Sequence, residues 1–174
     1  MRNEKSYVGI DLSSKTGFVS LDEVGNINEA IEIKSDNLGL RRMIDIINQI
    51  TDKIKRYDII TIENFSFGSK GRAVDFQFGL GHGLRMELYR ADTKYHLVAP
   101  AQLKLFSGAK GNANKIAVGV NVSKKWGFEP INNNDNITDA YVLAQISRAL
   151  DGKSKLTQAQ QKIIDNIREM KVND

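Results

Sequence analysis

The chain has 174 residues, no cysteine, two histidines and a net charge of +4 at pH 7. The absence of cysteine excludes disulfides and thiolate metal sites, and two histidines make no zinc pattern, so any metal ion must be held by oxygen atoms. No apolar run approaches the ~20 residues that a membrane span needs, and the N-terminus does not have the apolar core of a signal peptide. We therefore expect a cytoplasmic protein with one compact core.

The segment 7–21 predicts a β-hairpin that carries a buried carboxylate. An apolar run of strand formers begins at Tyr7 and ends in Asp11, and a polar turn containing Gly17 separates it from a second apolar run, Phe18 to Leu21. A charge near the middle of a sheet costs several kcal/mol unless it is paired, and a bound cation is one remedy. The alternative is that Asp11 caps the turn through a hydrogen bond to the backbone.

A third strand and a helix follow the hairpin. Residues 27–33 alternate well enough to complete an antiparallel meander. Ser35 or Asp36 is expected to cap a helix that ends near residues 55–56. Its packed face is predicted from the apolar residues at helical spacing: Leu40, Met43, Ile44, Ile47, Ile50 and Ile54.

Residues 58–63 form a short, nearly continuous apolar run that also ends in a carboxylate, Glu63. This pattern is typical of a central parallel strand that is buried on both faces. Because strand–helix–strand crossovers are right-handed, the strand should lie beside the first one, which places Glu63 near Asp11.

The loop 64–71 carries Phe65 and Phe67 next to these carboxylates, where the rings either meet a ligand or turn inward. A helix over residues 72–90 comes next, and its three glycines allow another backbone to approach closely, within the fold or between subunits. A fifth strand over residues 95–98 and a short helix from residue 100 to residue 106 complete this region.

The segment 107–115 predicts a flexible loop that leads into a helix capped by Asn114 and ending near residue 126. Free backbone N–H groups at a helix start, together with Lys110 and Lys115, suit a phosphate, although a plain connector is the alternative. Between residues 99 and 128 there are five lysines and no acidic residue, which suits a polyanion.

A third acidic site follows, in which Asp135, Asn136 and Asp139 share one side of a predicted helical turn. Asp135 or Asn136 is expected to cap this helix, whereas Asp139 lies beyond the cap. Acids from two neighbouring strands and a later helix would then converge, an arrangement that fits two divalent ions that assist displacement at phosphorus. Oxygen ligands alone select magnesium, with manganese as a substitute.

With these residues the chain resembles the RuvC-type Holliday junction resolvases of the RNase H-like superfamily, particularly their phage-borne members. The resemblance spans about residues 7–150 and rests on four motifs in the family's order: Val8-Gly9-Ile10-Asp11, Ile62-Glu63-Asn64-Phe65, Gly108-Ala109-Lys110-Gly111-Asn112-Ala113-Asn114-Lys115 and Asp139-Ala140. It implies an α/β fold with a five-stranded mixed sheet flanked by helices. It also implies a homodimer in a bacterial cell and magnesium-dependent nicking of branched DNA, a hydrolysis of phosphodiester bonds.

The resemblance also assigns residues to the metal centre. Asp11, Glu63 and Asp139 match the family's metal ligands. Where the commonest pattern has a further acid three residues before Asp139, this chain has Asn136, and Asp135 stands one residue earlier. Which of the two completes the site stays open.

The motif 108–115 matches the family's DNA-contacting loop and helix start, with Lys110, Asn112, Asn114 and Lys115 as the contacting residues. Phe65 or Phe67 corresponds to the aromatic residue that the family places near the junction.

Three other functions are compatible with parts of the pattern. One is an RNase H-like nuclease that acts on RNA–DNA hybrids, and another is a catalytically inactive protein that binds junctions. The segment 9–17 also resembles the first phosphate loop of actin-like ATPases, which need a second domain of the same kind. We expect a nuclease domain over residues 1–150 and a polar C-terminal tail, 151–174, with a short helix around residues 159–170.

Overall fold

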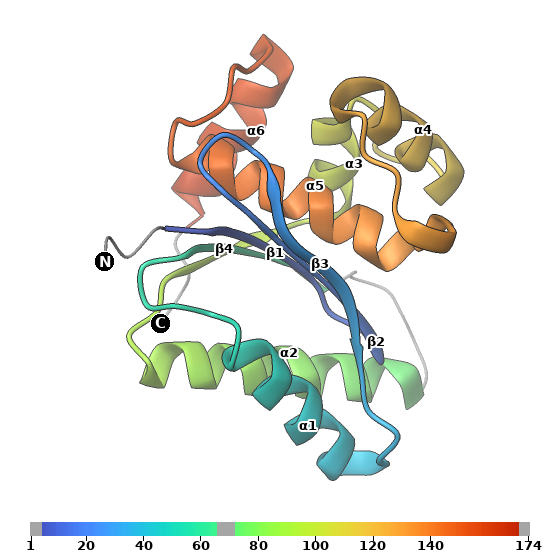
Figure 1. The fold of residues 1–174 in the computed structure, drawn as a ribbon, viewed down its shortest axis with the longest axis vertical. Helices are drawn as coiled ribbons and strands as arrows, with labels where there is room; N and C mark the ends of the chain where they lie inside the picture. Colours follow the sequence, from blue (N-terminus) through green and yellow to red (C-terminus); the bar gives the residue numbers. More distant parts are fainter. Residues whose placement is uncertain (1–4, 66–71, 171–174) are drawn as a thin grey trace.

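Five strands form one mixed sheet in the order β3-β2-β1-β4-β5 (Figure 1). The structure is a computed structural model that describes residues 5–65 and 72–170. The first three strands pair antiparallel, and the last two extend the sheet from β1 in parallel. Their bounds are β1 (Tyr7–Asp11), β2 (Lys15–Leu21), β3 (Ile27–Lys34), β4 (Ile59–Glu63) and β5 (Tyr95–Val98). The predicted five-stranded mixed sheet is confirmed.

Helices cover both faces of the sheet (Figure 1). One face carries two helices, α1 (Gly39–Thr51) and α2 (Arg72–Arg90). The other face carries α3 (Pro100–Ser107), α4 (Lys115–Trp126), α5 (Asp135–Leu150) and α6 (Gln158–Glu169), with a short 3-10 turn, η1 (Ile131–Asn133), leading into α5. No helix in the described part of the chain is long and apolar enough to cross a membrane.

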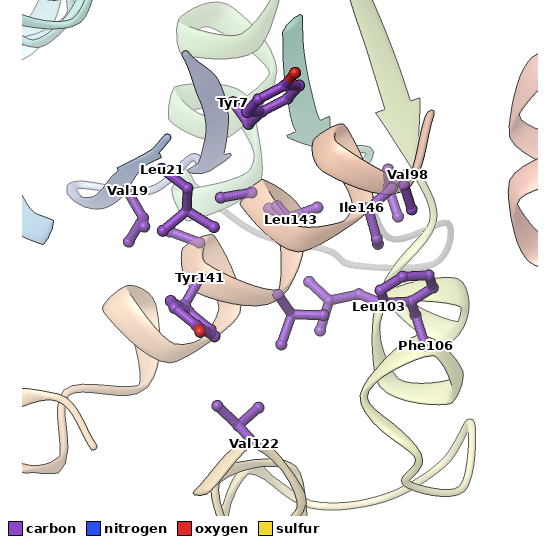
Figure 2. Packing of buried hydrophobic residues seen from close by; sticks show 14 of the residues in the cluster. Tyr7, Val19, Leu21, Val98, Leu103, Phe106, Val122, Tyr141, Leu143 and Ile146 are labelled. Carbon is purple, nitrogen blue, oxygen red and sulfur yellow. The ribbon is translucent and has the colours of Figure 1, made fainter. Parts of the chain in front are cut away.

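The alternation of side chains along the strands divides the core into two clusters. Tyr7 of β1 and Leu21 of β2 belong to the cluster on the α5 face. Val8 and Ile10 of β1 belong to the cluster under α1 and α2. Figure 2 shows the first cluster, in which side chains from the strands and from α3 and α4 surround Leu143 and the rest of α5. Asp11, two residues after Gly9 and four after Tyr7, therefore faces α5.

Two glycines let α5 lie directly on the sheet. A Cβ atom on Gly9 would stand 2.0 Å from the carbonyl oxygen of Ala140, and one on Gly17 would stand 1.9 Å from that of Asn136. Neither position can hold a side chain unless the helix moves away. The distance between α5 and strands β1 and β2 is thus set by the absence of side chains at these positions.

Two buried hydroxyl groups fix the position of α5 along the sheet. Thr61 of β4 donates its Oγ1 hydrogen to the carbonyl oxygen of Leu143 at 2.7 Å. Ser147 of α5 donates its Oγ hydrogen to the carbonyl oxygen of Val8 at 2.8 Å. Because a buried hydroxyl without a partner would cost about 1–3 kcal/mol, these bonds resist sliding of the helix.

The C-terminal helix α6 matches the short helix expected around residues 159–170. Thr157 and Gln160 form a capping box at its start. The Gln160 side chain also donates to the carbonyl oxygen of Phe106 at 2.8 Å, and Ile164 is fully buried in the cluster around α5. Residues beyond 150 thus share the core of the preceding sheet, while the division of the chain at residue 150 stays a prediction.

The first hairpin differs from the expectation in its turn. Gly17 was expected in the turn, but it lies within β2 and pairs with Asp11. The turn consists of Leu12 to Ser14, and β2 already begins at Lys15. Gly17 serves the contact with α5 described above, a requirement that local sequence does not reveal.

Helix α1 differs from the expectation at both ends. It begins at Gly39 after Leu38, which makes no side-chain cap, and it ends at Thr51. Ser35 or Asp36 was expected to cap this helix, but neither does so, and the Ser35 hydroxyl donates to Asp45 at 2.8 Å instead. The predicted packed face is also wrong at two positions, because Leu40 and Ile44 are 75% and 55% exposed.

We expect Gly9→Ala and Gly17→Ala to lower the free energy of unfolding by at least about 2 kcal/mol each, because the new methyl group must push α5 off the sheet. Urea unfolding followed by circular dichroism measures this loss. Gly119→Ala in α4 is the control, since a Cβ there meets nothing within 4 Å. That control should be neutral or stabilising by up to about 1 kcal/mol. Equal effects of all three substitutions would contradict the close packing of α5 on β1 and β2.

Candidate active site

Asp11 and Glu63 end neighbouring parallel strands at the same level. Ile10 of β1 lies opposite Ile62 of β4, so the next residue on each strand reaches the same edge of the sheet. Asp11 is only 7% exposed. The two carboxyl groups face each other closely enough to form a hydrogen bond. The predicted proximity of Asp11 and Glu63 is therefore present in the structure.

Helix α5 brings Asp139 to the same point. Asp139 lies one turn inside the helix, next to Ala140, whose carbonyl group meets Gly9 of β1. The charge of Asp11 raises the pKa of Asp139, and the charge of Asp139 raises the pKa of Glu63. Three acids from two strands and one helix thus converge on the α5 face of the sheet.

Burial and mutual repulsion make these acids hold their protons. Burial raises the pKa of Glu63 to about 9, and the neighbouring Asp11 contributes in the same direction. Burial also raises the pKa of Asp139 to about 7, again with a contribution from Asp11. The pKa of Asp11 is raised as well, chiefly by burial. A cation placed among the three carboxylates would relieve this repulsion.

Two lysines face the acids from the neighbouring helices. Lys115, at the start of α4, forms an ion pair with Asp135 at 2.8 Å, and its charge also acts on Asp11 and Asp139. Lys104 of α3 acts on Glu63 and Asp139, whose pKa values it lowers.

Lys104 is one of the five lysines of residues 99–128, but its place in the site was not predicted from the sequence. The order of the strands and helices nevertheless indicates where Lys104 lies. Helix α3 starts at the carboxyl end of β5, next to the end of β4, so a residue in its first turns lies near Glu63.

The start of α5 differs from the expectation. The side chain of Asn134 caps the helix by accepting hydrogen bonds from the backbone N–H groups of Asn136 and Ile137, so the expected cap by Asp135 or Asn136 is wrong. Asp135 is exposed and paired with Lys115, while Asn136 contributes its backbone to the contact with Gly17. The choice between Asp135 and Asn136 as a further ligand stays open.

The chemistry of these side chains suits a hard divalent ion, because all of them offer oxygen and their charges repel one another. Within residues 5–65 and 72–170, however, no group of three or more acidic or histidine side chains has the arrangement of a metal site. Magnesium binding therefore stays a prediction. It requires that Asp139 and the Asp11–Glu63 pair close around the ion.

The segment predicted to contact DNA lies at the surface beside the acids. Lys110, Asn112, Asn114 and Lys115 are all exposed. Asn114 caps α4, as expected, by accepting from the backbone N–H of Ala117 at 2.9 Å. Their contact with DNA stays a prediction.

Phe65 is turned onto α2. Its ring stacks on Phe78 with 4.2 Å between centroids, and the guanidinium of Arg85 lies 4.8 Å from the ring centroid. Gly81 leaves the space in which the ring lies. The inward orientation, which was one of the two alternatives, applies to Phe65, while Phe67 lies outside the described residues.

The raised pKa values predict a pH-dependent stability in the absence of divalent ions. In the folded chain, Asp139 and Glu63 remain protonated at pH values above their ordinary pKa values of 3.8 and 4.5. Their contribution to the free energy of unfolding is thus complete below those values and is lost as pH rises through about 7 and about 9. The loss should approach about 1 kcal/mol per pH unit and group.

Asp139→Asn and Glu63→Gln remove the ionisation with little change in shape. In EDTA at pH ~9, either variant should melt several degrees above the wild type, and the difference should vanish toward pH ~4. Thermal unfolding across this range provides the measurement. Asp36→Asn, at an exposed position, is the matched control. A wild-type midpoint that rises with pH relative to the variants would contradict the raised pKa values of these acids.

Comparison with known proteins gives a likeness in fold. No family model matches the sequence, and no curated protein matches it. The structure of T. thermophilus RuvC in complex with Holliday junction substrate superimposes with a TM-score of 0.64 at 16% identity, covering 87% of this chain and 98% of that one. A second structure, of Thermus thermophilus RuvC, gives 0.63 at 18% identity, covering 85% and 97%. The resemblance to RuvC is thus confirmed for the fold: an RNase H-like α/β fold with a five-stranded mixed sheet.

Proposed function

We propose that this protein is a metal-dependent endonuclease that nicks branched DNA, such as Holliday junctions, by hydrolysis of phosphodiester bonds. The observation that carries the proposal is the convergence of the buried Asp11 with the half-buried Glu63 and Asp139, all three with raised pKa values, in a fold shared with RuvC. Acids that are largely removed from water and lack enough cationic partners lower the stability of a protein, so their convergence favours a function that supplies the cation.

In this proposal Asp11, Glu63 and Asp139 hold two magnesium ions, with Asp135 or Asn136 as a further ligand. When bound, such ions activate the attacking water and stabilise the leaving oxygen. The chain's own contribution is to fix the carboxylates on rigid elements and to exclude water from around them. Both follow from the close seat of α5 on β1 and β2.

We further propose that DNA approaches over α3 and α4. Lys104 and Lys115 already lie beside the acids, and Lys110 is exposed on the loop between the two helices. Phosphate groups would compete with Asp135 for Lys115, which frees Asp135 as phosphate arrives. Asn112 and Asn114 are exposed on the same segment and can hydrogen-bond the DNA backbone.

The decisive experiment measures cleavage of labelled four-way junctions with magnesium, next to forks, flaps, plain duplex and RNA–DNA hybrids. Asp11→Asn, Glu63→Gln and Asp139→Asn should lower the cleavage rate by at least about 1,000-fold, because each removes a charged ligand. Junction binding should persist in all three, measured by fluorescence anisotropy. Asp135→Asn and Asn136→Ala, compared in the same assay, identify the further ligand by the larger loss.

Each alternative result has a distinct meaning. Cleavage by Asp139→Asn at the wild-type rate, or by the wild type in EDTA, would overturn the proposed metal centre. Preferential cutting of hybrids would identify an RNase H-like activity. Junction binding without cleavage of any substrate would identify an inactive junction-binding protein.

We also propose that the protein acts as a homodimer, because two symmetric nicks across a junction need two sites related by a two-fold axis. The layer formed by α1 and α2 leaves apolar side chains exposed: Leu40, Ile44, Met86 and Tyr89. Exposed apolar surface of this kind is typical of an interface. The glycines of α2 serve contacts within the chain, since Gly79 meets Met43 and Gly83 meets Ile47 of α1.

Light scattering of the wild type should give about twice the chain mass of 19.5 kDa. Ile44→Glu places a charge in the proposed interface and should give the monomer while the circular dichroism spectrum is unchanged. Val24→Glu, at a position 73% exposed in the turn between β2 and β3, is the control and should remain dimeric. A wild-type monomer both with and without DNA would contradict the dimer.

A further inference from the structure

The turn that follows Asp11 is held from the opposite face of the sheet. The carbonyl oxygen of Leu12 accepts a hydrogen bond from Nε2 of Gln77 in α2 at 3.2 Å. The carbonyl oxygen of Ser14 accepts one from Nη2 of Arg42 in α1 at 3.3 Å. The two helices of the α1–α2 layer therefore each reach the backbone immediately after the first acid.

The hydrogen bonds within the turn do not perform this task. The Ser13 side chain bonds the backbone of Lys15, accepting from its N–H and donating to its carbonyl oxygen. The Thr16 hydroxyl bonds the backbone of Ser13, again with both groups. These bonds set the local bend of the chain. They leave the carbonyl groups of Leu12 and Ser14 to Gln77 and Arg42.

The position of Arg42 leaves one of its buried N–H groups without a hydrogen-bond acceptor among the described residues. Its guanidinium lies 5.6 Å from the ring centroid of Phe76, and its Nε is buried with no hydrogen-bond partner among the described residues. An unpaired buried donor costs about 1–3 kcal/mol. A buried donor without a partner is expected mainly where the side chain is needed for a functional site and does not stabilise the fold.

We infer that Gln77 and Arg42 are positioning residues that fix the backbone after Asp11 and so hold its carboxylate against Glu63. The inference rests on the proposed nuclease function. Leu12 is adjacent to Asp11, and its side chain is buried beneath α1 and α2. Release of the turn lets the Asp11 carboxylate move, and a displacement of about 1 Å at a metal ligand is enough to slow catalysis about 100-fold.

The test compares variants that remove the two donors with one that removes a similar bond elsewhere. Gln77→Leu and Arg42→Met remove the donors, while Arg42→Lys keeps one. Gln49→Leu is the matched control. Nε2 of Gln49 in α1 donates to the carbonyl oxygen of Lys34 at 3.1 Å, and Lys34 ends a different strand, β3. Urea unfolding measures the loss of stability in each variant.

Manganese affinity is measured by titration calorimetry without DNA, and junction cleavage is measured with magnesium. Gln77→Leu and Arg42→Met should weaken manganese binding at least about tenfold, as expected when the support of a metal ligand is lost. They should lower kcat and leave KM for the junction unchanged. Arg42→Lys should recover part of both losses, and Gln49→Leu should match the wild type in both.

The outcomes separate this inference from the function on which it rests. If the wild type binds manganese and cuts junctions while Gln77→Leu and Arg42→Met behave like Gln49→Leu, the positioning role is overturned and the nuclease stands. If the wild type neither binds manganese nor cuts, both are overturned. If Arg42→Met does not fold, Gln77→Leu and Arg42→Lys decide the question by the same two measurements.

Discussion

Helix α5 lies so close to strands β1 and β2 that no side chain can stand between them at Gly9 and Gly17. This one constraint accounts for both the geometry and the electrostatics of the acidic cluster. It brings Asp139 within electrostatic reach of Asp11, and it removes much of the water that would otherwise solvate their charges. The proximity of the acids and their raised pKa values therefore have a single cause, which is a helix packed against bare backbone.

The two faces of the sheet differ in the side chains that they carry, and the turn after β1 follows an acid of one face and is contacted by helices of the other. On one face, Glu63 and the other acids lie under α5, with Lys104 and Lys115 beside them. On the other face, α1 and α2 expose apolar residues and reach through Arg42 and Gln77 to the end of β1. The same helices therefore carry both exposed apolar residues and the two side chains that donate to the turn after Asp11.

The sequence predicted those parts of the site that depend on local pattern and strand order. Asp11 and Glu63 each end an apolar run, and right-handed crossover geometry places the two runs side by side. Parts that depend on contacts between distant segments could not be predicted. Gly17 was expected in a turn because its contact lies on α5. Lys104 is a different case, because the start of α3 at the carboxyl end of β5 indicates a place near Glu63 and this signal was overlooked. The exposure of Ile44 was missed because helical spacing does not show which apolar residues lack a partner within the chain.

The order of the acids along the chain has a consequence for synthesis of the protein. Asp11 and Glu63 leave the ribosome well before Asp139, and the strands that carry them expose Gly9 until α5 arrives to cover it. A nascent or truncated chain that stops short of α5 has two acids and no third. The cluster of three acids is therefore complete only in a chain long enough to include α5.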